Sequence, residues 1–174
     1  MTTAKWNIDQ GHSEVNFKVK HLMISTVTGN FKVFEGVAET ATEEFKEIRN
    51  ISFKADVSSI NTNNEQRDAH LRSEDFFASE EHPFIEFNAE NFDTSKDKIQ
   101  GELSIRGTKR TVDFDVDFGG VVVDGYGQTK AGLTISGKIN RKEFGLTWDN
   151  VTEAGNVVVS DQVRISAEVQ FTKQ

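Results

Sequence analysis

Cysteine is absent from the 174-residue chain, and proline occurs once. Without cysteine, the protein has no disulfide framework, no thiolate nucleophile and no metal site with cysteine ligands. No apolar run is long enough to cross a bilayer, and residues 1–9 lack the basic start and apolar stretch of a secretory signal. We therefore expect a protein without an integral membrane segment that is cytoplasmic, or periplasmic or secreted if a signal has been removed.

Positive charge is also scarce, with 20 Lys and Arg against 28 Asp and Glu and a net charge of −8. Binding to a nucleic acid backbone or to an anionic membrane depends on clustered Lys and Arg, so the balance argues against either as the main partner. Aromatic residues with a polar atom are few, at one Tyr and two Trp against 14 Phe. A Phe-rich wall suits hydrocarbon, although an ordinary Phe-rich core has the same composition.

Apolar and polar residues alternate along most of the chain, which is typical of antiparallel strands with one solvated face. The alternating runs cover residues 15–20, 51–57, 85–90, 99–105, 112–118, 131–139 and 163–171. No linker interrupts them, so residues 1–174 are expected to form a single domain. The predicted fold class is all-β, an antiparallel barrel.

Several positions on the inward face carry a residue without bulk. They are Ala55, Ala89, Gly101, Ala131, Gly137 and Ala167. A packed core would fill such positions with large side chains, so the pattern predicts a hollow interior. The opposite possibility is a binding module whose core is packed to the barrel axis.

The segment from Thr62 to Phe77 breaks the alternation. Thr62 and Glu65 have the spacing of a capping box, and a short helix over about residues 63–77 is expected. Its apolar content is too low for a core helix, so a cap over one barrel end is the better interpretation. Thr40 and Glu43 have the same spacing, which predicts a hairpin connection with a helical turn within residues 40–50.

The four histidines are His12, His21, His70 and His82. No pair has the spacing of a metal site, so neither a metal nor another cofactor is expected. His21 continues the parity of Phe17 and Val19 and should point inward, either as a core histidine or toward a ligand. No nucleophile elbow or nucleotide-binding fingerprint is present, and we expect a protein that is not an enzyme.

Cations near predicted turns could meet an anionic head group at a barrel mouth, although exposed cations in turns are common. They are Arg67, Arg72, Lys109, Arg110, Arg141 and Lys142.

Four blocks in order along the chain resemble the signatures of the YceI-like family. They are His12-Ser13, Phe17, His21-Leu22, Gly29 and Phe31; then Arg67-Asp68, His70 to Ser73, Phe76-Phe77 and Pro83; then Gly101, Leu103 and Gly107; and last Arg141, Phe144, Gly145 and Leu146. The resemblance covers nearly the whole chain. It implies an eight-stranded, lipocalin-like antiparallel barrel that holds a long isoprenoid or other amphiphile, with no established catalytic residue. Many members of the family are periplasmic, and this chain differs from them in lacking a signal.

The combined hypothesis is a protein that binds a polyisoprenoid, quinone-like or fatty-acyl lipid in the barrel, for carriage, storage or sequestration. The alternative is an enzyme acting on a buried amphiphile, with His21 as acid or base. An exposed strand edge or a paired helix could support a homodimer. The residues expected to contact the ligand are Phe17, Val19, His21, Phe31, Phe53, Ala55, Leu71, Phe76, Phe87, Leu103, Ala131, Leu133, Ile135, Phe144, Leu146 and Ala167.

Overall fold

The computed structural model describes residues 3–149 and 158–174. Its strands are β1 (Ala4–Ile8), β2 (Glu14–His21), β3 (Ser25–Phe31), β4 (Phe34–Thr40), β5 (Glu47–Asp56), β6 (Ile60–Asn61), β7 (Phe84–Asp93), β8 (Lys98–Ile105), β9 (Thr108–Val123), β10 (Thr129–Asn140) and β11 (Val159–Lys173). One α-helix, α1 (Glu65–Arg72), and three single-turn 3-10 helices, η1 (Gln10–His12), η2 (Val57–Ser59) and η3 (Arg141–Phe144), complete the described part of the chain.

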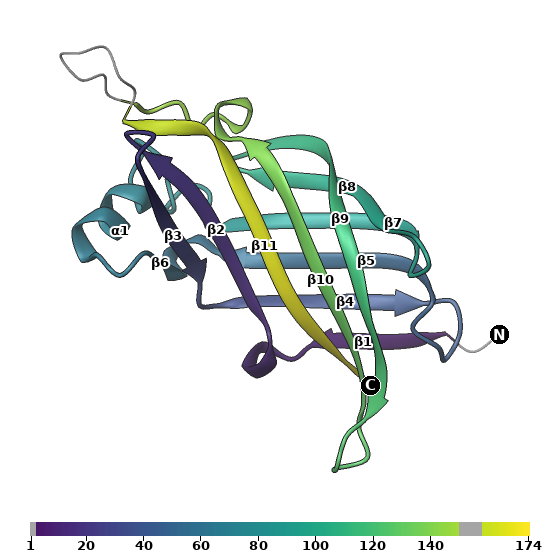
Figure 1. Cartoon of the computed structure of the whole chain (residues 1–174). Coiled ribbons are helices and arrows are strands. Elements are labelled where there is room, and N and C mark those ends of the chain that lie inside the picture. The colour runs from purple at the N-terminus through teal and green to yellow at the C-terminus, as the bar shows by residue number, and fades with distance from the viewer. Residues whose placement is uncertain (1–2, 150–157) are drawn as a thin grey trace.

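The strands form one antiparallel sheet that closes on itself, as predicted (Figure 1). The closed ring runs β1-β4-β5-β7-β8-β9-β10-β11, and β1 pairs back onto β11. It therefore contains eight strands within the described residues. The remaining strands, β2, β3 and β6, continue the sheet from the other part of β11.

Two strands share one edge of β11. The first part of β11 pairs with β2, where Ile165 lies opposite Phe17, and the last part pairs with β1, where Phe171 lies opposite Ile8. Between them the chain makes a corner through η1. Backbone hydrogen bonding continues across this corner, because Asp9 N–H donates to the carbonyl of Gln170 at 2.8 Å.

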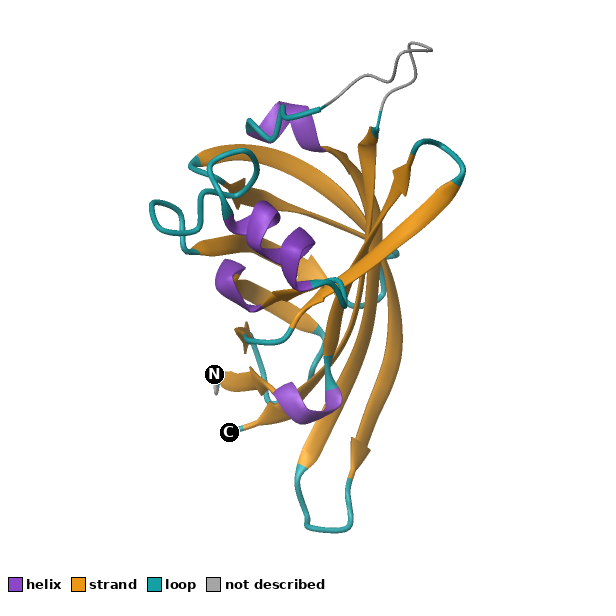
Figure 2. Ribbon diagram, turned by 90° about the vertical axis from the view of Figure 1, so that its left-hand side faces the viewer, coloured by secondary structure: helices purple, strands orange, loops and turns teal. Residues whose placement is uncertain are grey.

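The helix forms within the predicted range and lies over one end of the barrel (Figure 2). It begins two residues later than the capping-box spacing implies, because the cap is Asn64, whose side chain accepts from the N–H of Arg67 at 3.0 Å. Thr62 has another role. Its N–H and hydroxyl both donate to the buried carboxylate of Asp68, at 2.9 and 2.5 Å, which fixes α1 to the end of β6.

The helical turn expected within residues 40–50 does not form. The chain passes from β4 to β5 through bends at residues 41–46. Thr40 does not cap a helix, because its buried hydroxyl accepts from Trp6 Nε1 at 3.1 Å and donates to the carbonyl of Thr42 at 2.6 Å. The connection is thus tied down through a tertiary contact with β1.

Candidate functional site

A cavity runs inside the barrel. The space open to the centre of a water-sized sphere is about 190 Å³, many times the roughly 10–15 Å³ that one water molecule needs by that measure. Its lining is apolar apart from Asn16 and Arg141. The side chains come from β2, β3, β5, β7, β8, β9, β10 and β11, from α1 and from the segments that follow α1 and β10. Period-two alternation explains most of this lining, because side chains on every second residue of a strand point to the same face.

One end of the barrel is filled with aromatic rings, and we call it the packed end. Phe45, in the β4–β5 connection, inserts its ring 4.9 Å from that of Trp6 and 5.4 Å from that of Phe171. Phe118 of β9 also stacks on Phe45, with ring centroids 6.0 Å apart. Trp6 is fully buried and Phe45 nearly so. These contacts leave Phe171 as the cavity residue nearest to the packed end.

The opposite end is covered by two segments that we call the lid, residues 70–77 and 141–149. Leu71, Phe76 and Phe77 from the first segment and Leu146 from the second line the cavity. The rings of His70 and Phe76 meet that of Trp148 at 4.8 and 5.2 Å, so the two segments are in contact. The two lid segments contact each other through a few side chains. The rings of Trp6, Phe45 and Phe171 at the packed end, in contrast, belong to the main hydrophobic core.

Arg141 is a buried cation in the lining, but its donors are occupied. Nε and both Nη atoms donate to backbone carbonyls at 2.6 to 3.2 Å, and Nη2 lies 3.6 Å from the Asp149 carboxylate. The carbonyls belong to Leu146, Trp148, Val159 and Ser160. Burial lowers the pKa of Arg141 from its usual value, and the Asp149 charge opposes that change. Arg141 therefore fastens the second lid segment to the start of β11.

All of the residues expected to contact a ligand line the cavity except His21, Ala131 and Phe144. Their contact with a ligand stays a prediction. Phe144 is the last residue of η3, within the second lid segment, and it is buried. Ala131 is buried in the core opposite Phe171, two residues closer to the packed end than the lining residue Leu133.

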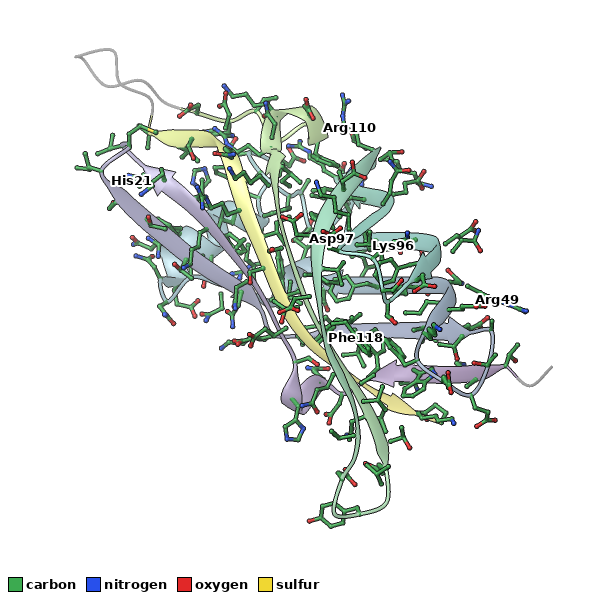
Figure 3. All side chains as sticks on the ribbon, turned by 45° about the vertical axis from the view of Figure 1, so that its right-hand side comes forward. His21, Arg49, Lys96, Asp97, Arg110 and Phe118 are labelled. Atoms are coloured by element: carbon green, nitrogen blue, oxygen red, sulfur yellow. The ribbon has the colours of Figure 1, made fainter. Side chains whose placement is uncertain are left out.

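His21 does not point into the cavity. It is the last residue of β2, pairs with Ser25 across a tight turn, and is exposed (Figure 3). Phe17 and Val19 line the cavity as their parity predicts, but β2 continues past the cavity before it turns. A buried substrate could not reach His21, so this residue does not supply the acid or base that the enzyme hypothesis requires.

The inward glycines do not create the hollow, which corrects the sequence interpretation. A Cβ on Gly137 would lie 2.4 Å from Cδ1 of Phe114, and one on Gly101 would lie 2.5 Å from Cζ of Phe87. Each glycine is thus covered by a ring from the neighbouring strand. Ala55 and Ala167 do line the cavity, whereas Ala89 is buried in the core.

Several lining residues are absent from the predicted ligand contacts. Most belong to the alternating runs: Val15, Ile51, Ile85, Ile99, Ile105, Phe114, Ile139, Val163, Ile165, Val169 and Phe171. Their position on the inward face of the alternating runs was enough to include them among the predicted ligand contacts. Phe77, Val159, Arg141 and Asn16 carried no such signal, because the first three lie outside the runs and Asn16 has the outward parity.

The described residues contain no cluster of three His, Asp or Glu side chains that could hold a metal ion. His12 lies 2.8 Å from Asp9, and His70 lies 2.9 Å from Asp75. Among residues 3–149 and 158–174, no helix has the length and apolar character to span a membrane.

Two of the other candidate head-group cations are also tied to the protein. Arg67 donates to the hydroxyl and the carbonyl of Thr62, and Arg110 donates to the carbonyl of Glu143. These bonds give both side chains structural roles on the outer surface.

Comparison with known proteins gives consistent matches over nearly the whole chain. The YceI-like domain matches residues 6–171. A UPF0312 protein of Staphylococcus epidermidis is 36% identical over 172 residues, covering 97% of this chain and 98% of that protein. A UPF0312 protein of Staphylococcus aureus strain USA300 is 34% identical over 170 residues, with the same coverage.

Solved structures resemble the barrel as well. The YCEI protein of Campylobacter jejuni is 31% identical, with a TM-score of 0.73 over 89% of this chain and 90% of that one. BcnA of Burkholderia cenocepacia is 18% identical and gives a TM-score of 0.77 over 94% of this chain and 98% of its own. A polyisoprenoid binding domain of Saccharophagus degradans is 13% identical and gives a TM-score of 0.74 over 97% of this chain and 98% of its own. The last two similarities show the fold alone.

Proposed function

Because the chain belongs to the YceI-like family, we propose that it binds a long-chain amphiphile, such as a polyisoprenoid, a quinone-like lipid or a fatty-acyl lipid, inside the barrel. The observation that carries the proposal is the apolar cavity between the packed end and the lid. The polyisoprenoid binding domain of Saccharophagus degradans, which has the same fold, agrees with a ligand of this kind. Carriage, storage or sequestration in the cytoplasm is the proposed role.

The cavity has the length for an extended tail. Along β11 it is lined from Val163 to Phe171, a stretch of roughly 26 Å at ~3.3 Å per residue. The packed end closes one side, so the tail would point toward Phe171 and the head group would lie near the lid. A cavity lined over this length suits a chain better than a compact ligand.

Tail burial should dominate the affinity. About 16 methylene groups at ~0.8 kcal/mol each give roughly 13 kcal/mol, against an association cost of about 4–15 kcal/mol. The head group gains little from Arg141, because that guanidinium already donates to backbone carbonyls. Affinity should therefore rise with chain length and depend weakly on the head group.

The test is a titration of delipidated protein with ligands that share one head group and differ in chain length. The dissociation constant should fall with each added unit until the tail reaches Phe171, and then level off. A constant that does not change with length would overturn the proposal. Ligand extracted after incubation should have an unchanged mass, whereas a new product would revive the enzyme hypothesis.

A matched pair of variants on β11 connects binding to the cavity. Ala167→Leu places bulk in the cavity, because Ala167 lines it. Its neighbour Ser166 is exposed on the outer face, so Ser166→Leu adds the same apolar volume outside. Long-chain binding should fall in the first variant and persist in the second.

A further inference from the structure

The outer face of the barrel carries a group of basic residues on three adjacent strands, which we call the cationic row. Lys18 of β2 lies opposite Arg164 of β11, and Arg164 lies opposite Lys138 of β10. Lys20 is two residues further along β2, on the same face as Lys18. All four side chains are exposed.

In the part of the chain that the structure describes, no ion pair neutralises the cationic row. Within residues 3–149 and 158–174, no carboxylate lies within ion-pair distance of Lys18, Lys20, Lys138 or Arg164, whereas the nearby Lys142 pairs with Asp161 at 3.0 Å. Like charges directly opposite each other on neighbouring strands destabilise a sheet. The row thus carries a cost in the isolated protein that an anionic partner would relieve.

Apolar side chains project next to the row, at the turn between β2 and β3. Met23 is 61% exposed and Ile24 is 83% exposed. We call residues 22–24 the tip. Met23 lines the same surface depression as Lys18, Lys20 and Arg164, so the tip and the row form one continuous surface.

The tip is also unusual in its backbone. Ile24 N–H donates to the carbonyl of His21 at 3.2 Å, and the two residues between them, Leu22 and Met23, have φ values of 52° and 59°, in the left-handed region. Hairpins of this geometry normally use Asn-Gly, because bulky side chains are strained there. The chain instead holds two long apolar side chains at the projecting point of a hairpin.

We propose that the tip and the cationic row dock the protein on an anionic lipid bilayer. Basic side chains are attracted to the surface of acidic lipids, and exposed aliphatic side chains enter the boundary between head groups and acyl chains. The acidic excess of the chain lies elsewhere, for example at Glu86 and Glu90 on the outer face of β7, which is several strands away from β11 on either path around the closed ring. Repulsion of those regions would orient the molecule with the tip toward the membrane.

The position of this surface favours a bilayer over a nucleic acid. The tip presents aliphatic side chains and no aromatic ring on which a base could stack. Val19 and Val163, which line the cavity, alternate with Lys18, Lys20 and Arg164 along the same strands. The docked face is therefore the outer side of the cavity wall. This inference goes beyond the proposed function and does not depend on it.

Cosedimentation of delipidated protein with vesicles tests the docking. The protein should bind vesicles of equal parts phosphatidylcholine and phosphatidylserine, bind phosphatidylcholine vesicles far less, and be released by added salt. The double variant Lys18→Gln with Arg164→Gln should bind the mixed vesicles about 30-fold more weakly, since each basic residue near such a surface contributes about one kcal/mol.

The matched control changes the same charge at a distant place. Arg49 and Lys96 are exposed and lie far from His21 and the tip (Figure 3). Arg49→Gln with Lys96→Gln should keep most of the vesicle binding. Equal losses in the two double variants, or equal binding to neutral and anionic vesicles, would overturn the proposal.

The tip has its own test. Ile24→Gln should weaken vesicle binding, whereas Val122→Gln should leave it unchanged, because Val122 is 65% exposed on the β9–β10 hairpin at the other end of the molecule (Figure 1). In Ile24→Trp, tryptophan emission should shift to shorter wavelength on anionic vesicles. An unshifted emission from vesicle-bound protein would contradict insertion of the tip.

Two further measurements separate this surface from other partners and from the cavity. Preference for a single-stranded oligonucleotide over mixed vesicles, at equal salt, would reject the bilayer as the partner. A polyprenyl ligand titrated without vesicles should bind the Lys18→Gln, Arg164→Gln variant as it binds the unmodified protein. If that titration fails for both proteins while vesicle binding persists, the cavity proposal falls and the docking surface stands.

Discussion

The two ends of the barrel are built from the same alternating pattern, yet one is packed and the other surrounds a cavity. At the packed end, the Phe45 ring from the β4–β5 connection fills the space between Trp6, Phe118 and Phe171. At the lid end, Phe31 meets Phe17 and Phe77 at ring distances of 5.7 and 6.3 Å but also borders the cavity. The strands therefore do not determine which end is filled. The β4–β5 connection does, because it inserts the Phe45 ring into the barrel.

The largest effect is expected from Phe45→Ala, at about 3–5 kcal/mol of unfolding free energy. The substitution removes a nearly fully buried ring and leaves its aromatic neighbours without contacts. Phe31→Ala should cost less, because Phe31 already lacks packing partners on its cavity side. Urea unfolding of both delipidated variants checks this order. A greater loss for Phe31→Ala would mean that the cavity is not empty in the delipidated protein.

The next comparison is between two alanines on neighbouring strands. Ala131→Leu should cost about 1–3 kcal/mol, because Ala131 is packed opposite Phe171 and has no space for the added atoms. Ala167→Leu should change the unfolding free energy little, because the new side chain extends into the cavity. Thermal unfolding must use delipidated protein, since bound lipid stabilises the folded state by mass action. Similar losses in both variants would contradict the contrast between the two ends.

A smaller effect is expected from Gly137→Ala, about 1 kcal/mol. The methyl group must displace the Phe114 ring, at a cost of about 1–3 kcal/mol, while the loss of chain freedom in the unfolded state returns about 0.4–1 kcal/mol. Gly132→Ala on the same strand is the control, because nothing lies within 4 Å of its new methyl group. That variant should be as stable as the unmodified protein or more so. A destabilised Gly132→Ala would show that strand glycines matter for another reason.

The smallest effect concerns the corner between β1 and β2. Lys130 and His12 hold the pKa of Asp9 at about 2, below its usual 3.8, by hydrogen bonding and charge. A lowered folded pKa stabilises the protein above about pH 4, and this contribution disappears as the pH falls toward 2. Asp9→Asn should therefore be less stable near neutral pH, by under about 1 kcal/mol for a partly exposed pair. Unfolding measured across this range should show the two proteins converging in acid. A constant difference would exclude the Asp9 charge as the cause.

Much of the fold was accessible from local pattern. The alternation of Val15, Phe17 and Val19, repeated along the chain, predicted strands with one apolar face, and the break after Thr62 predicted the helix. The exact cap was not accessible, because Thr62 bonds to Asp68 and leaves the cap to Asn64. The prediction of a helical turn after Thr40 was wrong for a similar reason, since the Thr40 hydroxyl accepts a hydrogen bond from Trp6.

The cavity was predictable in its chemistry but not in its extent. Parity placed Phe53, Leu133 and Ile135 in the lining, because side-chain direction along a strand is a local property. Parity failed for His21, since it does not tell where a strand runs past the cavity. The cover over Gly137 comes from Phe114, more than twenty residues away in the sequence, so no local pattern could reveal it.

The sequence by itself determined the period-two strands, the apolar inner face and the net charge of −8, because these depend on composition and on the order of neighbouring residues. Only the tertiary structure decided which end is filled, which small residues leave space, and where the scarce positive charge lies. Lys18, Lys138 and Arg164 are far apart in the chain and adjacent in the sheet. Strand pairing brings them together, and net charge, which has no spatial content, could not predict such a cluster.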